Sequence, residues 1–228
     1  LFMKAIQLVI QRNSRLIPPH GDGLKLYVGP MLRGSGQQLG LYPSAEFSFV
    51  VFVSPTGNYF KSAANGLNLH LETRRARAAV GGTGRTKCAG NYAVALKPLM
   101  DCKKLGFMDN IFLELDTYKK GNLGNAIVQE MSAANVFFVL KTGEIVTPSL
   151  ERGTILPGVT RDSVLKIVET CQADIKEAML ASTGQGSCFA SSRDVSVSEF
   201  MEATEAFCTG TAAELVPIAR VATGGDEE

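Results

Sequence analysis

Apolar residues recur along the chain with two different spacings, which predict a mixture of helices and strands. Residues 2–11 carry apolar side chains at the spacing of one broad helical face, and the Pro and Gly residues that follow end that helix. Two runs rich in β-branched and aromatic residues, 24–30 and 47–55, have the composition of strands. Because a Gly-rich stretch at 34–40 separates these runs, we expect two neighbouring strands.

Strands and helices alternate in the rest of the chain. Three further segments, 68–72, 110–116 and 135–140, have the composition of strands. Apolar residues at i, i+3, i+4 and i+7 predict one amphipathic helix over 162–180. The mixture favours an α/β or α+β fold, with a boundary near residues 60–72.

Composition excludes several functional classes. Lys and Arg number 23 against 22 Asp and Glu, and this net charge of +1 predicts no binding to nucleic acid or to a membrane surface. The longest apolar stretch, 47–53, is much shorter than the roughly 20 residues of a membrane span. The two histidines, His20 and His70, form no zinc motif, so no metal site is expected. Five widely spaced cysteines without CxxC favour reduced thiols and a reducing compartment.

A Gly-rich segment at 81–92, GGTGRTKCAGNY, surrounds Lys87 with small residues. The lysine of a nucleotide-binding P-loop directly follows a glycine, and Thr86 stands in that place here, so the P-loop motif fails. The glycines also lack the GxGxxG spacing of dinucleotide-binding folds. A lysine among small residues can approach a planar cofactor and form a Schiff base, whereas the alternative is an ordinary solvated lysine.

Two other segments offer free backbone N–H groups. In LPGVTRDS, at 156–163, Thr160 is expected at the cap of the helix that follows, where N–H groups and a hydroxyl can bind a phosphate. The alternative is a capped helix that binds nothing. In CTGTAAE, at 208–214, small residues form a turn before a possible helix, and the alternative is a tight loop.

Three segments occur in a characteristic order: GGTGRTKCAGNY, GTILPGVTRDS and EAFCTGTAAELVP, with LYVGP and VSPTGNYF upstream. In this arrangement the chain, from about residue 2 to residue 221, closely resembles the branched-chain amino acid aminotransferases, which are fold-type IV enzymes that use pyridoxal phosphate. The resemblance implies a remnant of the small N-terminal domain over 1–60, an interdomain linker over 61–72, and a large cofactor-binding domain over 73–228 that is short at its C-terminal end.

The resemblance also implies roles for individual residues. Lys87 would hold the cofactor aldehyde and move the substrate proton, Tyr92 would bind the phenolic oxygen, and Glu130 would keep the pyridine nitrogen protonated. The remaining contacts implied are Val159, Thr160 and Thr211 for the cofactor, and Tyr27, Tyr59 and Ala212 for the substrate. The two tyrosines have the alternative role of packing at the ends of strands.

Three positions depart from the family pattern. Gly29 replaces the arginine of the LYxRP motif, so leucine is expected to react better than glutamate, and Gly29→Arg to restore the reaction with glutamate. Ala133 replaces a Ser or Thr that contacts the substrate carboxylate. Pro98 falls inside an expected helix, where a kink or an early helix end is expected to absorb it.

Two functions therefore stay open. The first is amino-group transfer between leucine, isoleucine or valine and 2-oxoglutarate. The second is a non-catalytic remnant of the family that retains at most cofactor binding or partner contacts. A lyase acting on aminodeoxychorismate fits the fold but not the LYVGP and VSPTGNYF segments. The resemblance implies a homodimer if the part of the small N-terminal domain that the family has before residue 1 is present. The compartment stays open between plastid, mitochondrion and cytoplasm.

Overall fold

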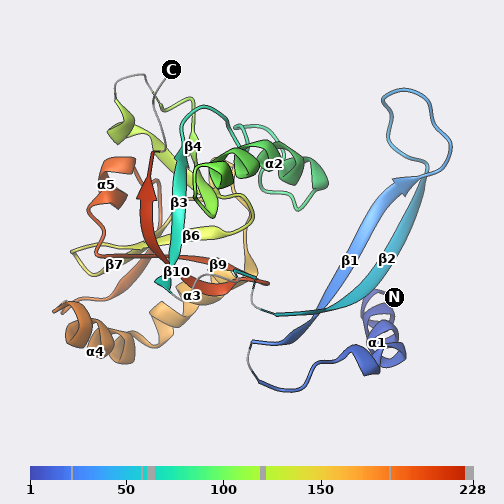
Figure 1. Ribbon diagram of the computed structural model, residues 1–228, viewed down its shortest axis with the longest axis horizontal. Helices are drawn as coiled ribbons and strands as arrows, with labels where there is room; N and C mark the ends of the chain where they lie inside the picture. The colour runs from blue at the N-terminus through green and yellow to red at the C-terminus, as the bar shows by residue number, and fades with distance from the viewer. Residues whose placement is uncertain (22, 58, 61–64, 119–121, 185, 224–228) are drawn as a thin grey trace. The chain divides into compact units, whose positions relative to one another are not determined.

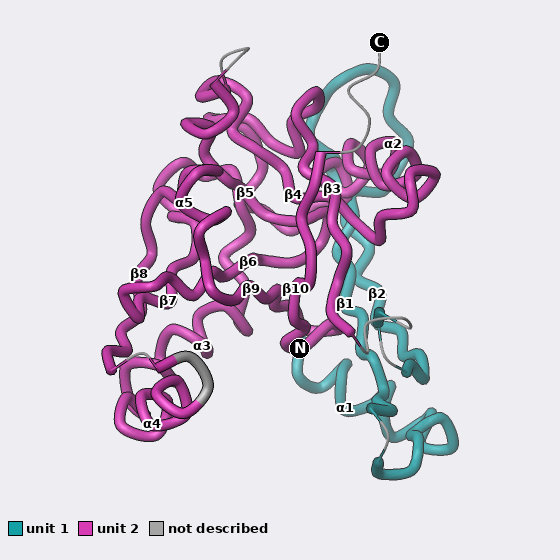
Figure 2. Tube along the Cα trace, turned by 60° about the vertical axis from the view of Figure 1, so that its left-hand side comes forward, with its two compact units in different colours: residues 1–60 teal, residues 61–228 magenta. Residues whose placement is uncertain are grey.

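The computed structural model describes residues 1–21, 23–57, 59–60, 65–118, 122–184 and 186–223. The chain divides into two compact units, Leu1–Phe60 and Lys61–Glu228, which are coloured separately in Figure 2. Each unit has its own sheet, because no strand of one unit pairs with a strand of the other among the described residues.

The first unit contains a helix and a long antiparallel hairpin. Its elements are α1 (Phe2–Arg12), the short 3-10 helix η1 (Ser14–Leu16), β1 (Lys25–Ser35) and β2 (Glu46–Thr56). The two strands pair along their whole length, as the composition predicts, and the Gly-rich stretch connects them. Helix α1 packs on β2 through the rings of Phe2 and Phe49, whose centroids lie 5.7 Å apart.

Gly29 faces Phe52 across the hairpin. The two residues are register partners in β1 and β2, and a Cβ added at Gly29 would lie 2.3 Å from the ring atom Cζ of Phe52. The ring therefore fills the space that a side chain at this position would need. Gly29→Arg as a single change, which the sequence suggests, conflicts with this packing.

The second unit is built on a mixed eight-stranded sheet in the order β5-β4-β3-β10-β9-β6-β7-β8. The strands are β3 (Leu67–Glu72), β4 (Asp109–Glu114), β5 (Ile127–Met131), β6 (Asn135–Val139), β7 (Glu144–Thr147), β8 (Phe189–Ser192), β9 (Glu205–Gly210) and β10 (Glu214–Ala222). The helices are α2 (Ala89–Lys104), α3 (Val159–Thr170), α4 (Gln172–Thr183), α5 (Val197–Met201) and the 3-10 helix η3 (Leu123–Asn125). Figure 1 shows the helices of this unit arranged around the sheet.

Strand β10 connects the two halves of the sheet. Residues 214–217 pair antiparallel with β9, and the following residues pair parallel with β3. The register shifts between Ile218 and Arg220, where the strand changes partner. Strands β4 and β6 are buried along their whole length, as expected for strands covered on both faces.

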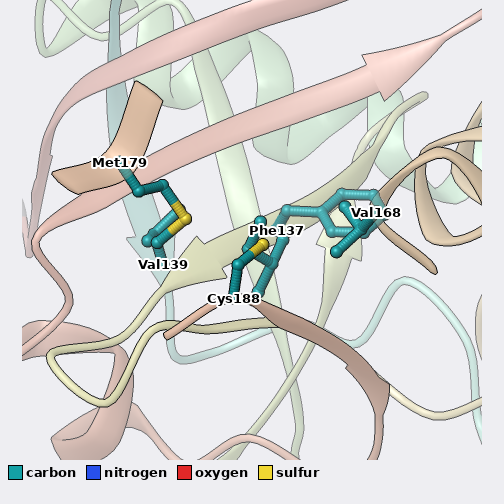
Figure 3. Close-up of a cluster of buried hydrophobic side chains, with 6 residues drawn as sticks. Phe137, Val139, Val168, Met179 and Cys188 are labelled. Carbon is teal, nitrogen blue, oxygen red and sulfur yellow. The ribbon is translucent and has the colours of Figure 1, made fainter. Parts of the chain in front are cut away.

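A hydrophobic core lies between β6 and the α3–α4 pair. Phe137 and Val139 of β6 pack against Val168 of α3, Met179 of α4 and Cys188, as Figure 3 shows. All these side chains are buried. Each Å² of apolar surface removed from water contributes about 25 cal/mol of stability, so this cluster stabilises the unit and fixes both helices on the sheet.

The prediction of a single helix over 162–180 is wrong. The structure has two helices, α3 and α4, which meet at Cys171. At Cys171 the backbone leaves helical geometry, with φ −111° and ψ 32°. The apolar spacing continues across this break, and Val168 and Met179 from the two helices are buried in one cluster, which explains why the pattern predicted one element.

Three other expectations need correction. The resemblance implies an interdomain linker over 61–72, but residues 67–72 form β3 inside the sheet, so this prediction is wrong for that half. Residues 61–64 lie outside the described ranges. The segment 208–214 comprises the end of β9, the turn at 211–213 and the first residue of β10, and no helix follows it among the described residues. Helix α2 continues past Pro98 to Lys104, so the proline does not end it early. No helix in the described part of the chain is both long and apolar enough to cross a membrane.

Candidate active site

Lys87 follows a loop that the side chain of Asn91 holds in place. Asn91 is buried, and its Nδ2 donates hydrogen bonds to the carbonyls of Thr83 and Thr86 over 2.7 and 2.6 Å. Its Oδ1 accepts a bond from the Thr83 hydroxyl over 2.8 Å. Lys87 Nζ then donates to the phenolic oxygen of Tyr92 over 2.7 Å. The start of α2 thus places an exposed amine beside a phenol.

Glu130 is a buried carboxylate on β5 with three donors around it. Its Oε1 lies 2.8 Å from Nη2 of Arg77 and accepts the backbone N–H of Leu156 over 2.9 Å. Its Oε2 accepts Nδ2 of Asn135 over 2.7 Å. Only 3 % of the side chains of Glu130 and Arg77 is exposed, so the two charges form a buried ion pair.

Burial raises the pKa of Glu130 to about 7, because an ionised carboxylate loses its hydration in the interior. The positive charge of Arg77 is the largest effect that lowers this pKa, and the N–H of Leu156 follows. The charges of Lys87 and Arg161 act in the same direction. This electrostatic effect of Lys87 on Glu130 and the hydrogen bond between Lys87 and Tyr92 are the observations that relate the three residues to one another.

The start of α3 is tied to the same carboxylate through Asn135. The Nδ2 of Asn135 also donates to the carbonyl of Leu156 over 2.9 Å, and a Cβ added at Gly158 would lie 2.2 Å from its Oδ1. Gly158 is the N-cap of α3, so Val159 and Thr160 are its first two residues, and the cap position expected for Thr160 is wrong. Among the described residues no side chain caps α3, which leaves the N–H groups of its first turn without acceptors inside the helix.

Arg161 fixes this first turn of α3 to the sheet. Its guanidinium is buried, and Nη2 donates to the carbonyl of Pro148 over 3.0 Å and to the hydroxyl of Ser192 over 2.6 Å. Burial lowers the pKa of Arg161, and the nearby carboxylates of Asp162 and Glu130 partly offset this effect. The end of α3 that carries the free N–H groups is thus held rigidly and lies near a buried positive charge.

Two tight turns of the sheet lie next to each other. One joins β5 to β6 and contains Ala133, and the other joins β9 to β10 and contains Thr211 and Ala212. Asn135 and Thr209 are register partners just beside these turns, and a Cβ added at the neighbouring Gly210 would lie 3.7 Å from the carbonyl oxygen of Ala133. Both turns therefore belong to one end of the β6–β9 pair.

Tyr27 and Tyr59 belong to the first unit. Tyr27 lies on β1, with its ring 6.3 Å from that of Phe52, and Tyr59 makes an edge-to-face contact with Phe60 at 4.9 Å. These contacts agree with the packing alternative, and the substrate-pocket role of the two tyrosines stays a prediction.

Three residues that organise the site escaped prediction from the sequence. Arg77 carried no signal, because a buried arginine and a surface arginine look alike in a sequence. Asn91 lies in the GNY segment that drew attention for Tyr92 alone. Asn135 could have been found, because it is the one polar residue at the start of the apolar strand NVFFV.

The arrangement combines three chemical features. It has an exposed amine paired with a phenol, a buried carboxylate paired with arginine, and the uncapped N-terminus of a helix, which is suited to an anion. Among the described residues, no three His, Cys, Asp or Glu side chains are grouped so that they could hold a metal ion. The site thus combines an amine that could capture a carbonyl group with a helix N-terminus suited to an anion.

Comparisons with known proteins point in one direction. The model of the family described as amino-transferase class IV matches residues 1–221. The chain is 39 % identical over 220 residues to the chloroplastic branched-chain-amino-acid aminotransferase 5 of Arabidopsis thaliana, covering 96 % of the chain and 47 % of the relative. It is also 39 % identical over 220 residues to the methionine aminotransferase BCAT4 of the same plant, covering 96 % of the chain and 55 % of that relative.

A solved structure is similar throughout most of the chain. A branched-chain amino acid aminotransferase from T.th., solved with pyridoxamine 5'-phosphate, superposes with a TM-score of 0.73 at 25 % identity, covering 96 % of this chain and 61 % of that one. The chain thus spans about half the length of the curated relatives that it matches.

Proposed function

Since the chain belongs to the amino-transferase class IV family, we propose that it transfers the amino group between a branched-chain amino acid and 2-oxoglutarate, with pyridoxal phosphate as cofactor. The single observation that carries the proposal is the pairing of the Lys87 amine with Tyr92 near the buried carboxylate of Glu130. Class IV aminotransferases use pyridoxal phosphate, and the similar T.th. structure contains its amine form.

The donor set of this chain fits that cofactor. Pyridoxal phosphate has an aldehyde, a phenolic oxygen, a ring nitrogen and a phosphate, and each group has a suitable counterpart. Lys87 offers an amine, Tyr92 a phenol and Glu130 a carboxylate, while the uncapped first turn of α3 offers N–H groups and the Thr160 hydroxyl. Gly158 lets that turn approach Asn135, so a larger residue there would push it away from the carboxylate.

The residues then have separate tasks. When bound, the cofactor supplies a carbonyl that captures amino groups and a ring that withdraws electrons from the substrate. Lys87 holds the cofactor and afterwards moves a proton at the substrate α-carbon, Tyr92 donates to the ring oxygen, and Glu130 keeps the proton on the ring nitrogen. Val159, Thr160 and Thr211 bind the phosphate.

The substrates are an amino acid and a 2-oxo acid. We assign the N–H of Ala212 to the substrate carboxylate, because the β9–β10 turn carries it beside the turn of Ala133. Tyr27 and Tyr59 line the pocket for the apolar side chain. The methionine aminotransferase among the relatives makes a linear thioether side chain a competing substrate class.

Organisation and compartment are part of the same proposal. We assign residues 1–60 to the small N-terminal domain and residues 67–228, which include β3, to the large cofactor-binding domain, and we infer that the protein forms a homodimer. All five cysteines are free thiols in the structure, which favours a reducing compartment, and the chloroplastic relative favours a plastid.

A non-catalytic remnant that binds the cofactor without turnover is the second candidate. It is favoured by Ala133, which has no hydroxyl for the substrate carboxylate, and by the ring of Phe52 over Gly29. This candidate expects cofactor binding at Lys87 with no transfer of amino groups.

The deciding experiment measures glutamate formed from leucine and 2-oxoglutarate with pyridoxal phosphate present. The expected result is turnover that disappears in Lys87→Ala and persists in Lys104→Ala, which removes an exposed lysine from the last turn of α2. Turnover in Lys87→Ala would refute the assignment of this lysine. Cofactor binding without turnover in the native chain would favour the remnant.

A further inference from the structure

We propose that Arg77 is a positioning residue for the reaction: its buried guanidinium holds the Glu130 carboxylate in the ionised form that the cofactor ring nitrogen requires. The inference rests on the proposed function for its purpose, but its physical content concerns this chain alone. Arg77 lies in the loop after β3, and nothing in the local pattern of residues there connects it with Glu130.

The geometry ties the two residues closely. Arg77 Nη2 lies 2.8 Å from Oε1 of Glu130, and Nη1 donates to the carbonyl of Thr154 over 3.0 Å. Arg77 contacts only Oε1, so the second carboxylate oxygen of Glu130, Oε2, has one described donor, Asn135. A carboxylate oxygen accepts two hydrogen bonds, so Oε2 retains room for a proton donor such as a protonated ring nitrogen.

A purely structural role is the main alternative, because the loop of Arg77 is also braced by neutral groups. The neighbouring residue on β5, Gln129, donates its Nε2 to the carbonyl of Ala78 over 3.0 Å. Consecutive residues of one strand therefore hold consecutive residues of the loop, one through a charge and one through an amide. This pair supplies a matched control, since Gln129 braces the same loop without changing the charge.

The charges around Glu130 come from three segments. Arg77 lies in the loop after β3, Lys87 precedes α2, and Arg161 lies in the first turn of α3. Of the three, only Arg77 forms an ion pair with the carboxylate among the described residues. Burial of Glu130 opposes ionisation, and Arg77 is the largest of the charges that favour it.

The test is the titration of Glu130 in the chain without cofactor, followed by carbon-13 NMR of labelled glutamate carboxyl groups. The Glu130 signal is assigned by its loss in Glu130→Gln. We expect a midpoint at about 7 in the native chain, and a midpoint at least about one pH unit higher in Arg77→Gln, because a neighbouring arginine lowers a carboxyl pKa by about 1 to 3 units. Arg77→Lys should return the midpoint to within about half a unit of the native value.

The control separates charge from bracing. Gln129→Met removes the amide brace of the same loop and should leave the Glu130 midpoint unchanged. An unchanged midpoint in Arg77→Gln, or an equal rise in Gln129→Met, would overturn the proposal. If Arg77→Gln does not fold, Arg77→Lys decides alone, since a midpoint far above the native one would show that a positive charge at this position is not sufficient. None of these outcomes depends on whether the chain transfers amino groups.

Discussion

Lys87 and Tyr92 form a hydrogen bond of 2.7 Å between an amine and a phenol on either side of the start of α2. The nitrogen also lies 5.3 Å from the centre of the tyrosine ring. Asn91 holds the loop before the helix through three hydrogen bonds, which fixes the position of Lys87 relative to Tyr92.

The first prediction concerns which lysine captures the cofactor. Incubation with pyridoxal phosphate followed by borohydride reduction should fix the cofactor on Lys87, and peptide mass mapping should find it in the segment TKCAGNY. Lys87→Ala should lose this label, while Lys104→Ala should keep it. A label on any other lysine would contradict the site described above.

The second prediction concerns the dependence of stability on pH. The pKa of Glu130 is raised from 4.5 to about 7 in the folded chain, so its stabilising contribution is complete below about pH 4.5 and is lost as the pH rises through about 7. Glu130→Gln has no such group. The free energy of unfolding of the native chain relative to this variant should therefore fall by up to about 3 kcal/mol between pH 4.5 and 7.

Chemical denaturation at a series of pH values checks this prediction. The variant also leaves the guanidinium of Arg77 buried without a carboxylate, so its stability is lower overall, and only the change with pH tests the idea. A constant difference between the two proteins from pH 4.5 to 7 would show that the pKa of Glu130 is not raised in the folded chain.

The third prediction concerns Gly29 and Phe52. Gly29→Ala should lower the free energy of unfolding by about 1 to 3 kcal/mol, because the added Cβ would lie 2.3 Å from the Phe52 ring. The same substitution in a Phe52→Ala background should cost much less, since the space is then empty. A double-mutant cycle measures the coupling, and simple additivity of the two changes would contradict the packing.

This packing changes the substrate experiment that the sequence suggests. In single-turnover measurements with cofactor, we expect leucine to react faster than glutamate in the native chain. Gly29→Arg combined with Phe52→Ala should raise the rate with glutamate, whereas Gly29→Arg alone should not, because the ring occupies the site of the new side chain. Equal rates with leucine and glutamate in the native chain would show that another residue recognises the acidic side chain.

The fourth prediction concerns the turn that carries Thr211 and Ala212. Glu214, directly after this turn, has a φ of 61°, which is the left-handed region that costs a non-glycine residue about 1 to 2 kcal/mol. Glu214→Gly should therefore raise the free energy of unfolding by about 1 kcal/mol. As a control, Glu205→Gly in the regular strand β9 should lower it. A loss of stability in Glu214→Gly would show that the contacts of the glutamate exceed the strain.

The sequence predicted the strands whose burial is continuous. Segments 68–72, 110–116 and 135–140 lie almost wholly within β3, β4 and β6, because covered strands read as apolar runs. Short strands such as β7 and β8, with four residues each, are too brief to produce a pattern. Strand β9, EAFCTG, was hidden by its small and polar residues and by the turn chemistry that follows.

The candidate site was predictable only where a residue type itself carries the chemistry. Lys87, Tyr92 and Glu130 are chemically distinctive in their motifs, and the structure brings them together. Arg77 acts through an ion pair with a partner far away in the sequence, and such pairs leave no trace in local spacing. The packing of Phe52 on Gly29 depends on the register of a hairpin, which the composition of its strands does not determine.

Strand β10 also dictates a sequence of events during synthesis. It is the last described strand of the chain, yet it lies in the middle of the sheet between β3 and β9. On the ribosome, the two half-sheets on either side must remain separate until residues 214–222 have emerged. Until then the edge of β3 that β10 will cover has unpaired N–H and C=O groups, which are templates for pairing with other chains, whereas β9 emerges together with β10 as a hairpin. The nascent protein is therefore most exposed to aggregation immediately before this strand is complete, and protection by chaperones matters most in that interval.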